Sequence, residues 1–141
     1  MKISKRMSLA ATAACLAVLA MAGCVGIAGT PATPEFQVKA RAQQRADALV
    51  KRDLARAYQF FTPAYRASVS SEAYQKSIGN ALVLVSAQVE AVECESLEKC
   101  IAKVRVKIKP LVTRRFTGTI DSYGDETWLY EAGQWWFFQK L

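Results

Sequence analysis

The sequence predicts an α+β fold in which N-terminal helices pack on a curved antiparallel sheet. Between residues 35 and 61, apolar residues recur every three or four positions, which is the spacing of a helix with one buried face. From residue 83 onward they alternate with polar residues, which is the spacing of strands. Helices followed by a run of strands are typical of a sheet covered on one side.

The helical half begins with one long amphipathic segment. Its apolar face comprises Val38, Ala42, Ala46, Leu49 and Val50, with Phe36 and Ala40 at the margin. We expect Arg41, Arg45 and Arg52 on the opposite face. A break near 51–53 makes Asp53 the N-cap of a second helix that continues to Phe61, and Thr62-Pro63 stops that helix or starts a new turn. Residues 70–72 then open another short helix, which Gly79-Asn80 closes.

Strands follow at 83–91, 100–109, 116–120 and 127–130, and a glycine turn at 131–134 leads into a last strand at 135–138. Matching the apolar faces of the first two strands pairs Val89 with Val104 and Val85 with Ile108. In this register the numbers of paired residues sum to 193, whereas those of Cys94 and Cys100 sum to 194, so the two cysteines are not directly opposite each other. A disulfide between them therefore requires a one-residue bulge, which we expect between Ala91 and Cys94.

Length and composition limit the number of domains and the kinds of catalytic or metal site that the chain can form. The 141 residues suit a single domain, and 19 Lys and Arg against 12 Asp and Glu give a net charge of +7. There is no histidine, which excludes Ser-His-Asp and Cys-His nucleophiles and His-ligated zinc. We expect no cofactor and no metal.

The first 23 residues have the features of a secretory signal peptide. Lys2, Lys5 and Arg6 precede an uncharged run at 7–22, which is shorter than the roughly 20 apolar residues that a membrane-spanning helix needs. Removal of this segment takes three basic residues and no acidic ones, so the net charge falls to +4.

The segment ends in Leu-Ala-Met-Ala-Gly-Cys at 19–24, which resembles the lipobox of bacterial lipoproteins apart from Met21, where that family prefers Leu. The resemblance implies that Cys24 becomes the acylated first residue and that the protein is exported and anchored to the cell envelope, at the outer membrane facing the periplasm. The alternative is an ordinary signal peptide followed by a coincidental cysteine. Residues 24–34 would then form a tether of roughly 30 Å at most.

Removal of the signal peptide also discards Cys15, so Cys94 and Cys100 remain beside Cys24. Their spacing, with five residues between them, is not that of a redox Cys-x-x-Cys motif, and two cysteines cannot complete a zinc site. In an oxidising compartment the spacing favours a structural disulfide over a reactive pair.

Two stretches, RADALVKRDLARAYQFFTPAYR at 45–66 and TWLYEAGQWW at 127–136, resemble the nuclear transport factor 2-like superfamily. The resemblance covers about residues 35–141 and implies a cone-shaped α+β domain. The superfamily contains isomerases, dehydratases and hydrolases as well as proteins without known activity, so the fold alone assigns no function. Its enzymes typically place an Asp, His or Tyr inside the cone.

Three sets of residues are candidates for a site. Asp47 lies at the edge of the apolar helix face, where partial burial would raise its pKa toward that of a general base; the alternative is a boundary carboxylate paired with Lys or Arg. A group of aromatic side chains either lines a pocket at the mouth of the cone or forms core. This group comprises Tyr58, Phe61, Tyr65, Trp128 and Trp136.

The third set is a basic stripe on one strand, which would contact anionic headgroups or would simply be solvated, with Glu90 as a cross-strand partner. The stripe comprises Lys103, Arg105, Lys107 and Lys109. We expect no nucleic-acid partner for an exported lipoprotein.

Two function hypotheses remain. The first is a non-catalytic envelope lipoprotein that binds a small apolar ligand or a protein partner, with a homodimer through the sheet as a further partner. The second is a cone-pocket enzyme of isomerase or hydrolase type that uses Asp or Tyr in place of histidine. The enzyme needs a buried carboxylate facing a cavity, whereas the binding protein needs only apolar walls.

Overall fold

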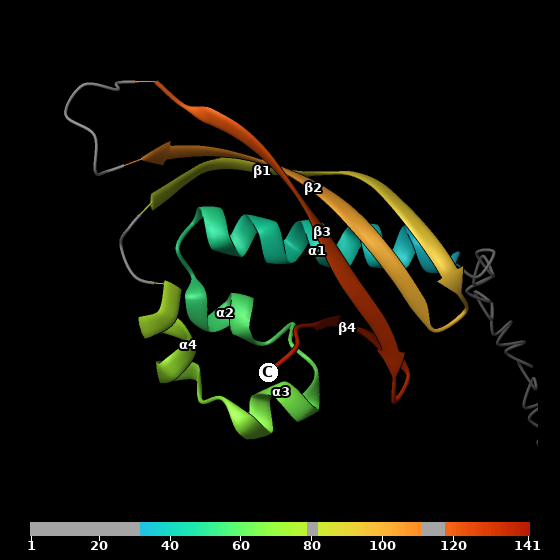
Figure 1. The fold of residues 1–141 in the computed structure, drawn as a ribbon. Helices are drawn as coiled ribbons and strands as arrows, with labels where there is room; N and C mark the ends of the chain where they lie inside the picture. Colours follow the sequence, from blue (N-terminus) through green and yellow to red (C-terminus); the bar gives the residue numbers. More distant parts are fainter. Residues whose placement is uncertain (1–31, 79–81, 111–117) are drawn as a thin grey trace, which may run out of the picture.

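The computed structural model describes residues 32–78, 82–110 and 118–141, in which helices precede a four-stranded antiparallel sheet of order β1-β2-β3-β4 (Figure 1). The predicted α+β class is therefore confirmed. The elements are α1 (Pro34–Val50), α2 (Leu54–Tyr58), α3 (Pro63–Ser68), α4 (Ser71–Ile78), β1 (Leu82–Ser96), β2 (Lys99–Pro110), β3 (Ile120–Glu131) and β4 (Gln134–Phe138).

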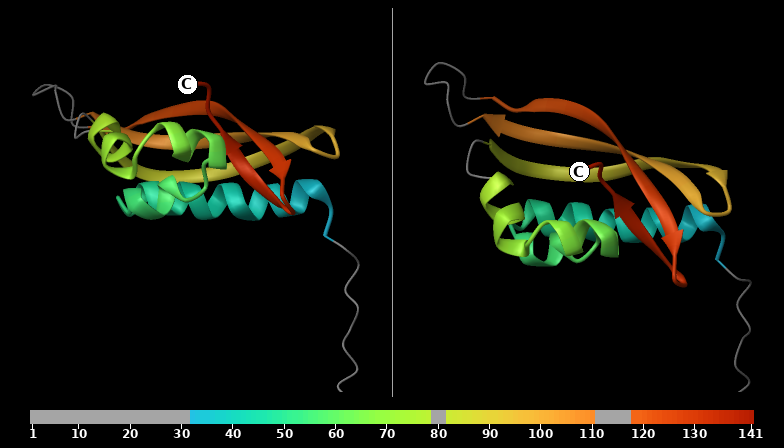
Figure 2. Two further views of the ribbon diagram at one scale, coloured as in Figure 1. Left: turned by 90° about the horizontal axis from the view of Figure 1, so that it is seen from below. Right: turned by 60° about the horizontal axis from the view of Figure 1, so that its bottom comes forward.

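The long helix α1 lies along the concave side of the curved strands β1–β3, and the three short helices follow beside it (Figures 1 and 2). Its closest packing partner is β1. The short strand β4 continues the sheet beyond β3 and turns toward α3. All helices are thus on one side of the sheet, which leaves the outer side without a helical layer in the described part of the chain.

Side-chain caps set the helix boundaries. Thr33 caps α1 and Pro34 is its first residue, so the helix begins at the last residue of the predicted tether. Asp53 caps α2 as predicted, by accepting a hydrogen bond from the Arg56 N–H at 3.0 Å. That helix ends at Tyr58 rather than at Phe61, because Thr62 caps a new helix, α3, behind it.

The buried face of α1 is confirmed at its centre and wrong at its edges. Val38, Ala42 and Ala46 are almost completely buried, whereas Phe36 is 68% exposed. Arg45, which we placed on the solvent face, is only 7% exposed, and Arg41 is half-buried. Aromatic rings from β4 and from the segment after α2 take both guanidinium groups out of solvent.

Bulges in β1 reconcile the register with the disulfide. Val89 pairs with Val104, and Cys94 pairs with and is disulfide-bonded to Cys100, both as predicted. The bulge between them lies at Glu90 rather than beyond Ala91. It therefore turns Ala91 toward solvent.

A second bulge, at Val85, was not predicted. Because of this bulge, Ile108 pairs with Leu84 rather than with Val85, and the Val85 side chain is 46% exposed. The pattern of alternating valines in the sequence contains no sign of this inserted residue.

The strand β3 is continuous over Ile120–Glu131, where the sequence predicted two short strands at 116–120 and 127–130. Residues 116 and 117 of the first lie outside the described residues, and only Ile120 of the rest is in the strand. The stretch 121–126 looks like a loop in the sequence because its inward residues are Ser122, Gly124 and Glu126, none of which is apolar.

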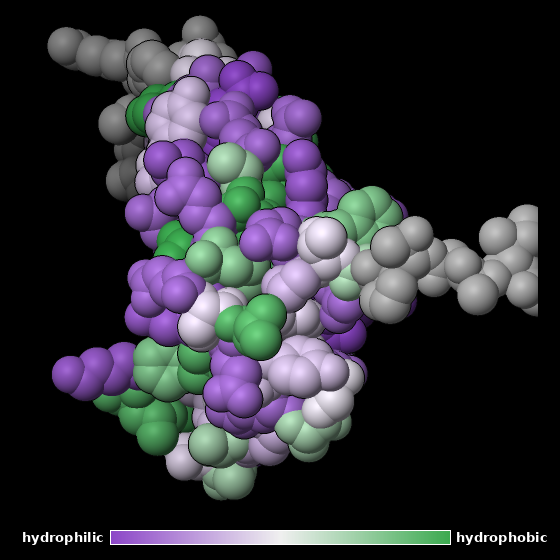
Figure 3. Space-filling view, turned by 90° about the vertical axis from the view of Figure 1, so that its right-hand side faces the viewer, coloured by the Kyte–Doolittle hydropathy of each residue, from purple (hydrophilic) through white to green (hydrophobic). Residues whose placement is uncertain are grey.

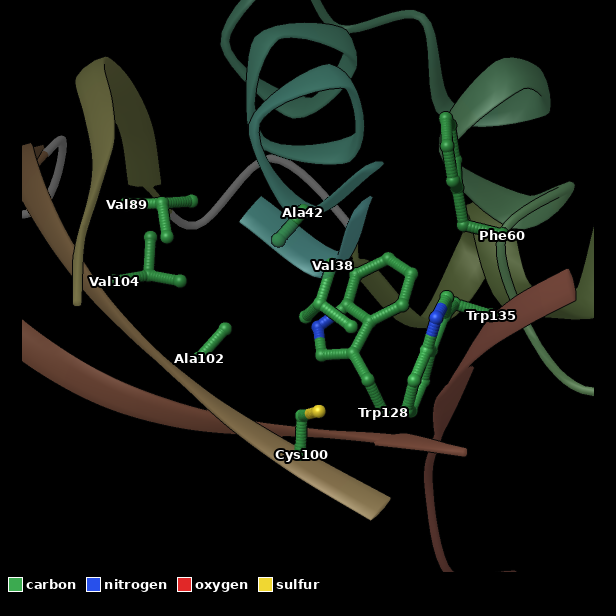
Figure 4. Packing of buried hydrophobic residues seen from close by; sticks show 9 residues of the cluster. All are labelled: Val38, Ala42, Phe60, Val89, Cys100, Ala102, Val104, Trp128 and Trp135. Carbon is green, nitrogen blue, oxygen red and sulfur yellow. The ribbon is translucent and has the colours of Figure 1, made fainter. Parts of the chain in front are cut away.

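The main core lies between α1 and the inner face of the sheet, where its side chains converge (Figure 4). Trp128 is completely buried at its centre, and its ring packs edge-on against Phe60 with the ring centroids 6.4 Å apart. The remaining members of the cluster are Val38, Ala42, Val89, Cys100, Ala102, Val104 and Trp135.

Both edges of the sheet have partners outside the ladder. On β1, the Gln43 side chain donates to the Ala87 carbonyl oxygen at 3.1 Å and accepts from the Val89 N–H at 2.9 Å. On β4, the Phe137 N–H donates to the Phe60 carbonyl oxygen at 2.7 Å, and the Thr62 N–H donates to the Phe137 carbonyl oxygen at 3.1 Å.

We expect reduction of the Cys94–Cys100 disulfide to lower the free energy of unfolding by about 2 kcal/mol, because the bond closes a short loop in the unfolded chain. Urea unfolding with and without reductant measures the difference. The doubly substituted chain, Cys94→Ala with Cys100→Ala, is the control and should not respond to the reductant. An unchanged unfolding midpoint in the unsubstituted protein would contradict the prediction.

Candidate ligand groove

A hollow of about 230 Å³ lies between α1 and the inner face of β1–β3; we call it the groove. Its apolar walls come from three elements: Leu49 of α1, Leu84 of β1, and Val104 with Val106 of β2. The fourth wall is the stretch 122–126 of β3. This hollow lies on the concave side of the sheet, next to the main core.

The groove exists because the inner face of β3 carries small residues at this point. Ser122 is opposite Val106 and Gly124 is opposite Val104, so neither fills the space above its valine partner. A Cβ atom added at Gly124 would meet no atom within 4 Å. Among the described strands, β4 pairs with β3 only from Thr127 onward, so the edge of β3 beside the groove has no strand over it.

A second hollow of about 300 Å³ shares Leu49 and Leu84 with the groove. It continues toward the short helices, where Leu54 of α2 and Ile78 of α4 line it. Together the two hollows form a strip along the C-terminal half of α1 that is largely apolar, with Arg52 and Ser77 as polar residues in the wall of the second hollow.

Glu126 of β3 lies in the wall of the groove with its side chain on the inner face of the sheet, and it forms a buried salt bridge with Arg45 of α1. The exposed fractions of the two side chains are 15% and 8%, so the pair is largely removed from solvent. Arg45 binds one carboxylate oxygen, and the Trp128 indole N–H donates to the other at 3.3 Å.

Burial raises the pKa of the Glu126 carboxyl above its usual range, although the Arg45 guanidinium and the Trp128 indole N–H both lower it. Arg45 itself points away from the groove. Its guanidinium carbon lies 3.8 Å from the centre of the Phe137 ring and 5.5 Å from that of Phe61. The groove is therefore lined by the carboxylate, while the cation is enclosed by aromatic rings.

Tyr74 of α4 is the other titratable group near this pair. Its hydroxyl is buried without a hydrogen bond of standard geometry. Burial raises the pKa of the Tyr74 hydroxyl, and the nearby Arg45 guanidinium lowers it. Tyr74 packs with the aromatic rings around Arg45. It therefore lies near the guanidinium group and is not part of the groove wall.

The predicted general base, Asp47, lacks the partial burial we expected. Its side chain is exposed, and its Oδ1 accepts a hydrogen bond from the Gln43 side chain at 2.8 Å. The buried carboxylate of this structure is instead Glu126. Glu126 was not predicted, because it stands in a polar stretch that is typical of a loop. Its two-residue spacing from Trp128, which places both on the same strand face, was the available signal.

The five aromatic residues proposed to line a pocket are all buried, and the two hollows described above have other residues in their walls. Tyr58, Phe61 and Tyr65 pack with Tyr74 in a second apolar cluster, in which the Phe61 and Tyr65 rings stack with centroids 4.1 Å apart. Trp128 belongs to the main core. Trp136 is 9% exposed, and Arg66 lies over its ring. The structure thus gives these residues the role of core.

The basic stripe of β2 is surrounded by acidic residues. Arg105 forms a salt bridge with Glu90 at 2.9 Å, the partner expected if the stripe is simply solvated. Lys103 and Lys107 are directly opposite Asp125 and Asp121 in the ladder. Lys109 is exposed near the end of the strand. The positive charge available to an anionic surface is therefore smaller than the sequence suggests.

The predicted lipidation site, Cys24, lies outside the described residues. Within residues 32–78, 82–110 and 118–141, no helix combines the length and apolarity needed to cross a bilayer. The same residues contain no group of three or more His, Cys, Asp or Glu side chains arranged to hold a metal ion.

No family model matches the chain, and no curated protein matches its sequence. Among solved structures, the chain is similar to a SEC-C motif containing protein from Rhodopseudomonas palustris, determined in solution, with a TM-score of 0.55 and 11% identity. The match covers 71% of this chain and 73% of that one. At this identity the likeness concerns the fold alone.

We expect Arg45→Met to lower the free energy of unfolding by about 3–5 kcal/mol, because it leaves the buried Glu126 carboxylate without its counter-ion. Adding Glu126→Gln should restore more than half of that loss, because the double variant buries no charge at this site. Urea unfolding at neutral pH measures both.

The matched control for the ion-pair variants is Arg105→Met, which breaks the half-exposed salt bridge with Glu90. It should change stability by no more than about 1 kcal/mol. Equal effects of Arg45→Met and Arg105→Met would show that burial of the Arg45–Glu126 pair has no energetic consequence.

Proposed function

We propose that this protein is an exported, lipid-anchored envelope protein that binds a small apolar ligand in the groove and does not catalyse a reaction. The observation that carries the proposal is the groove itself. Leucine and valine side chains form its walls, and the small inner residues of β3 leave it unfilled. Ligand sites in proteins are typically concave, largely apolar and supplied with a few polar groups.

The energetics favour a ligand in this position. The groove is open to solvent on one side, so an apolar ligand bound there would remove leucine and valine side chains from water. Apolar surface buried there contributes roughly 25 cal/mol per Å². The neighbouring hollow, which shares Leu49 and Leu84, extends the apolar surface and suits an elongated ligand.

We also propose that the domain is of the nuclear transport factor 2-like type. Support comes from the two quoted stretches and from the arrangement of helices on the concave side of a curved antiparallel sheet. In such a fold the concave side is where a ligand binds, which agrees with the position of the groove.

The lipid anchor would hold the groove near a membrane. The chain enters α1 at the end of the molecule shown in Figure 3, where hydrophilic side chains predominate and smaller apolar areas lie between them. The groove begins near Ala46, about 18 Å along α1 from Pro34 at the helical rise per residue. With a tether of roughly 30 Å, the groove would remain within about 50 Å of the lipid headgroups.

An enzyme remains the second candidate, because Glu126 is a buried carboxylate facing a cavity. Burial raises the pKa of the Glu126 carboxyl toward the range of a general base. However, Arg45 and Trp128 each occupy one of its oxygens, and the exposed Asp47 offers no second carboxylate in the groove. Binding therefore ranks before catalysis.

If Cys24 carries the anchor, Cys24→Ala should abolish incorporation of labelled palmitate, because the lipobox then has no thiol to accept the diacylglyceryl group. Metabolic labelling in a bacterial host, followed by gel autoradiography, measures it. Cys15→Ala is the matched control and should leave labelling unchanged, since that residue is removed with the signal peptide. Labelling of the Cys24→Ala chain would contradict the assignment.

Gly124→Leu should fill the groove and reduce ligand capture to below about a tenth of the unsubstituted level, without loss of stability. The new side chain points into open space, and glycine weakens a strand relative to other residues. The assay is photo-crosslinking of the full-length protein in lipid nanodiscs with a diazirine-bearing medium-chain alcohol, with labelled peptides identified by mass spectrometry.

The matched control is Ala91→Leu, which adds the same side chain to the exposed outer face of β1. It should be labelled like the unsubstituted protein. Full labelling of Gly124→Leu, or labelling confined to peptides outside the groove, would show that the ligand site is not here.

A further inference from the structure

The Glu126 carboxylate retains hydrogen-bonding capacity on the groove side. A carboxylate can accept about four hydrogen bonds, two at each oxygen, and the structure accounts for two of them, from Arg45 and Trp128. Its side chain is in the groove wall and is 15% exposed, so together with Ser122 it is a polar group that a ligand in the groove would meet.

The side chains around the groove favour a hydrogen-bond donor over an anion. Among the described residues of its wall, Glu126 is the charged one whose side chain is on the inner face of the sheet, since Asp125 is opposite Lys103 on the outer face. Arg45 neutralises Glu126 from the side away from the groove, because its guanidinium packs against the rings of Phe137 and Phe61, so the negative end of the ion pair faces a ligand. A ligand carboxylate or phosphate would thus lie beside the negative end of the ion pair, which is unfavourable.

A cationic head is also disfavoured. Arg45 already neutralises Glu126, so the pair as a whole presents a dipole rather than a net charge to the groove. An ammonium group would lose its hydration on entry and find its counter-ion already paired, which is an unfavourable exchange. A neutral hydroxyl loses much less on desolvation and needs only one acceptor.

From this geometry we propose that the groove takes an uncharged, single-chain amphiphile whose hydroxyl head donates a hydrogen bond to Glu126. The hydrocarbon chain lies against Leu49 and Leu84 and continues toward the second hollow. A fatty alcohol and a monoacylglycerol both have this chemistry. The inference rests on the proposed function, because it specifies the ligand class of the same groove.

The test compares three diazirine-bearing medium-chain probes that differ only in the head: an alcohol, an amine and a carboxylic acid. Full-length protein in zwitterionic nanodiscs at neutral pH is labelled with each. Labelling of Gly124→Leu is subtracted for each probe, which removes labelling outside the groove, and the probes are compared at equal measured concentrations in the nanodisc lipid. We expect the alcohol to exceed the acid by at least about tenfold and to exceed the amine as well.

The double variant Arg45→Met with Glu126→Gln tests the cause of the selectivity. It keeps the apolar walls and a side-chain acceptor but removes both charges, so labelling by the acid should rise to within about threefold of that by the alcohol. Near-ultraviolet circular dichroism checks that it folds. If it does not, the ratio for the unsubstituted protein decides the proposal alone.

The outcomes separate the two proposals. Failure of all three probes to label groove peptides would overturn the proposed function. Groove labelling in which the acid or the amine equals or exceeds the alcohol would overturn the head-group inference and leave the proposed function standing. A folded double variant that still rejects the acid would also overturn the inference, because Glu126 would then not be the source of the selectivity.

Discussion

The buried salt bridge between Arg45 and Glu126 is the constraint on which the arrangement of the domain depends. It joins α1 to β3, two of the four elements that line the groove. It also brings the guanidinium group under Phe137 of β4, so one interaction connects the helix, the sheet and the aromatic cluster. Buried pairs of this kind contribute little net stability, but they penalise arrangements that separate the partners. Here such a penalty acts on the sliding of α1 along the sheet.

The fold could be predicted from the sequence because its strongest patterns are local. The apolar spacing that includes Val38 and Ala42 places α1, and the alternation of valines with lysines around Val104 places β2. The requirement for a bulge followed from the register alone, since Cys94 and Cys100 could not be opposite each other without one inserted residue. The position of the bulge did not follow, because a bulge at Glu90 and one beyond Ala91 both shift the register by one residue before Cys94.

The candidate site could not be predicted, because its residues depart from the local rules. Arg45 looks like a solvent-facing helix residue, and only the distant rings of Phe61 and Phe137 make its burial favourable. Glu126 and Gly124 look like parts of a loop, and the ladder with β2 is what places them in a strand. Positions where local preference and tertiary structure disagree are often functional. This disagreement is itself a reason to look for function in the groove rather than at Asp47.

The contact of Gln43 with β1 bears on self-association. With its carbonyl oxygen and amide nitrogen, this side chain bonds one N–H and one C=O on the free edge of the strand, much as a single residue of an adjacent strand would. A second molecule that extended the sheet at β1 would first have to displace it, and the bulges at Val85 and Glu90 interrupt the straight edge that such pairing needs. The helix thus supplies a short substitute for a fifth strand, and at Ala87 and Val89 it covers part of the edge that an extended, valine-rich strand would otherwise expose.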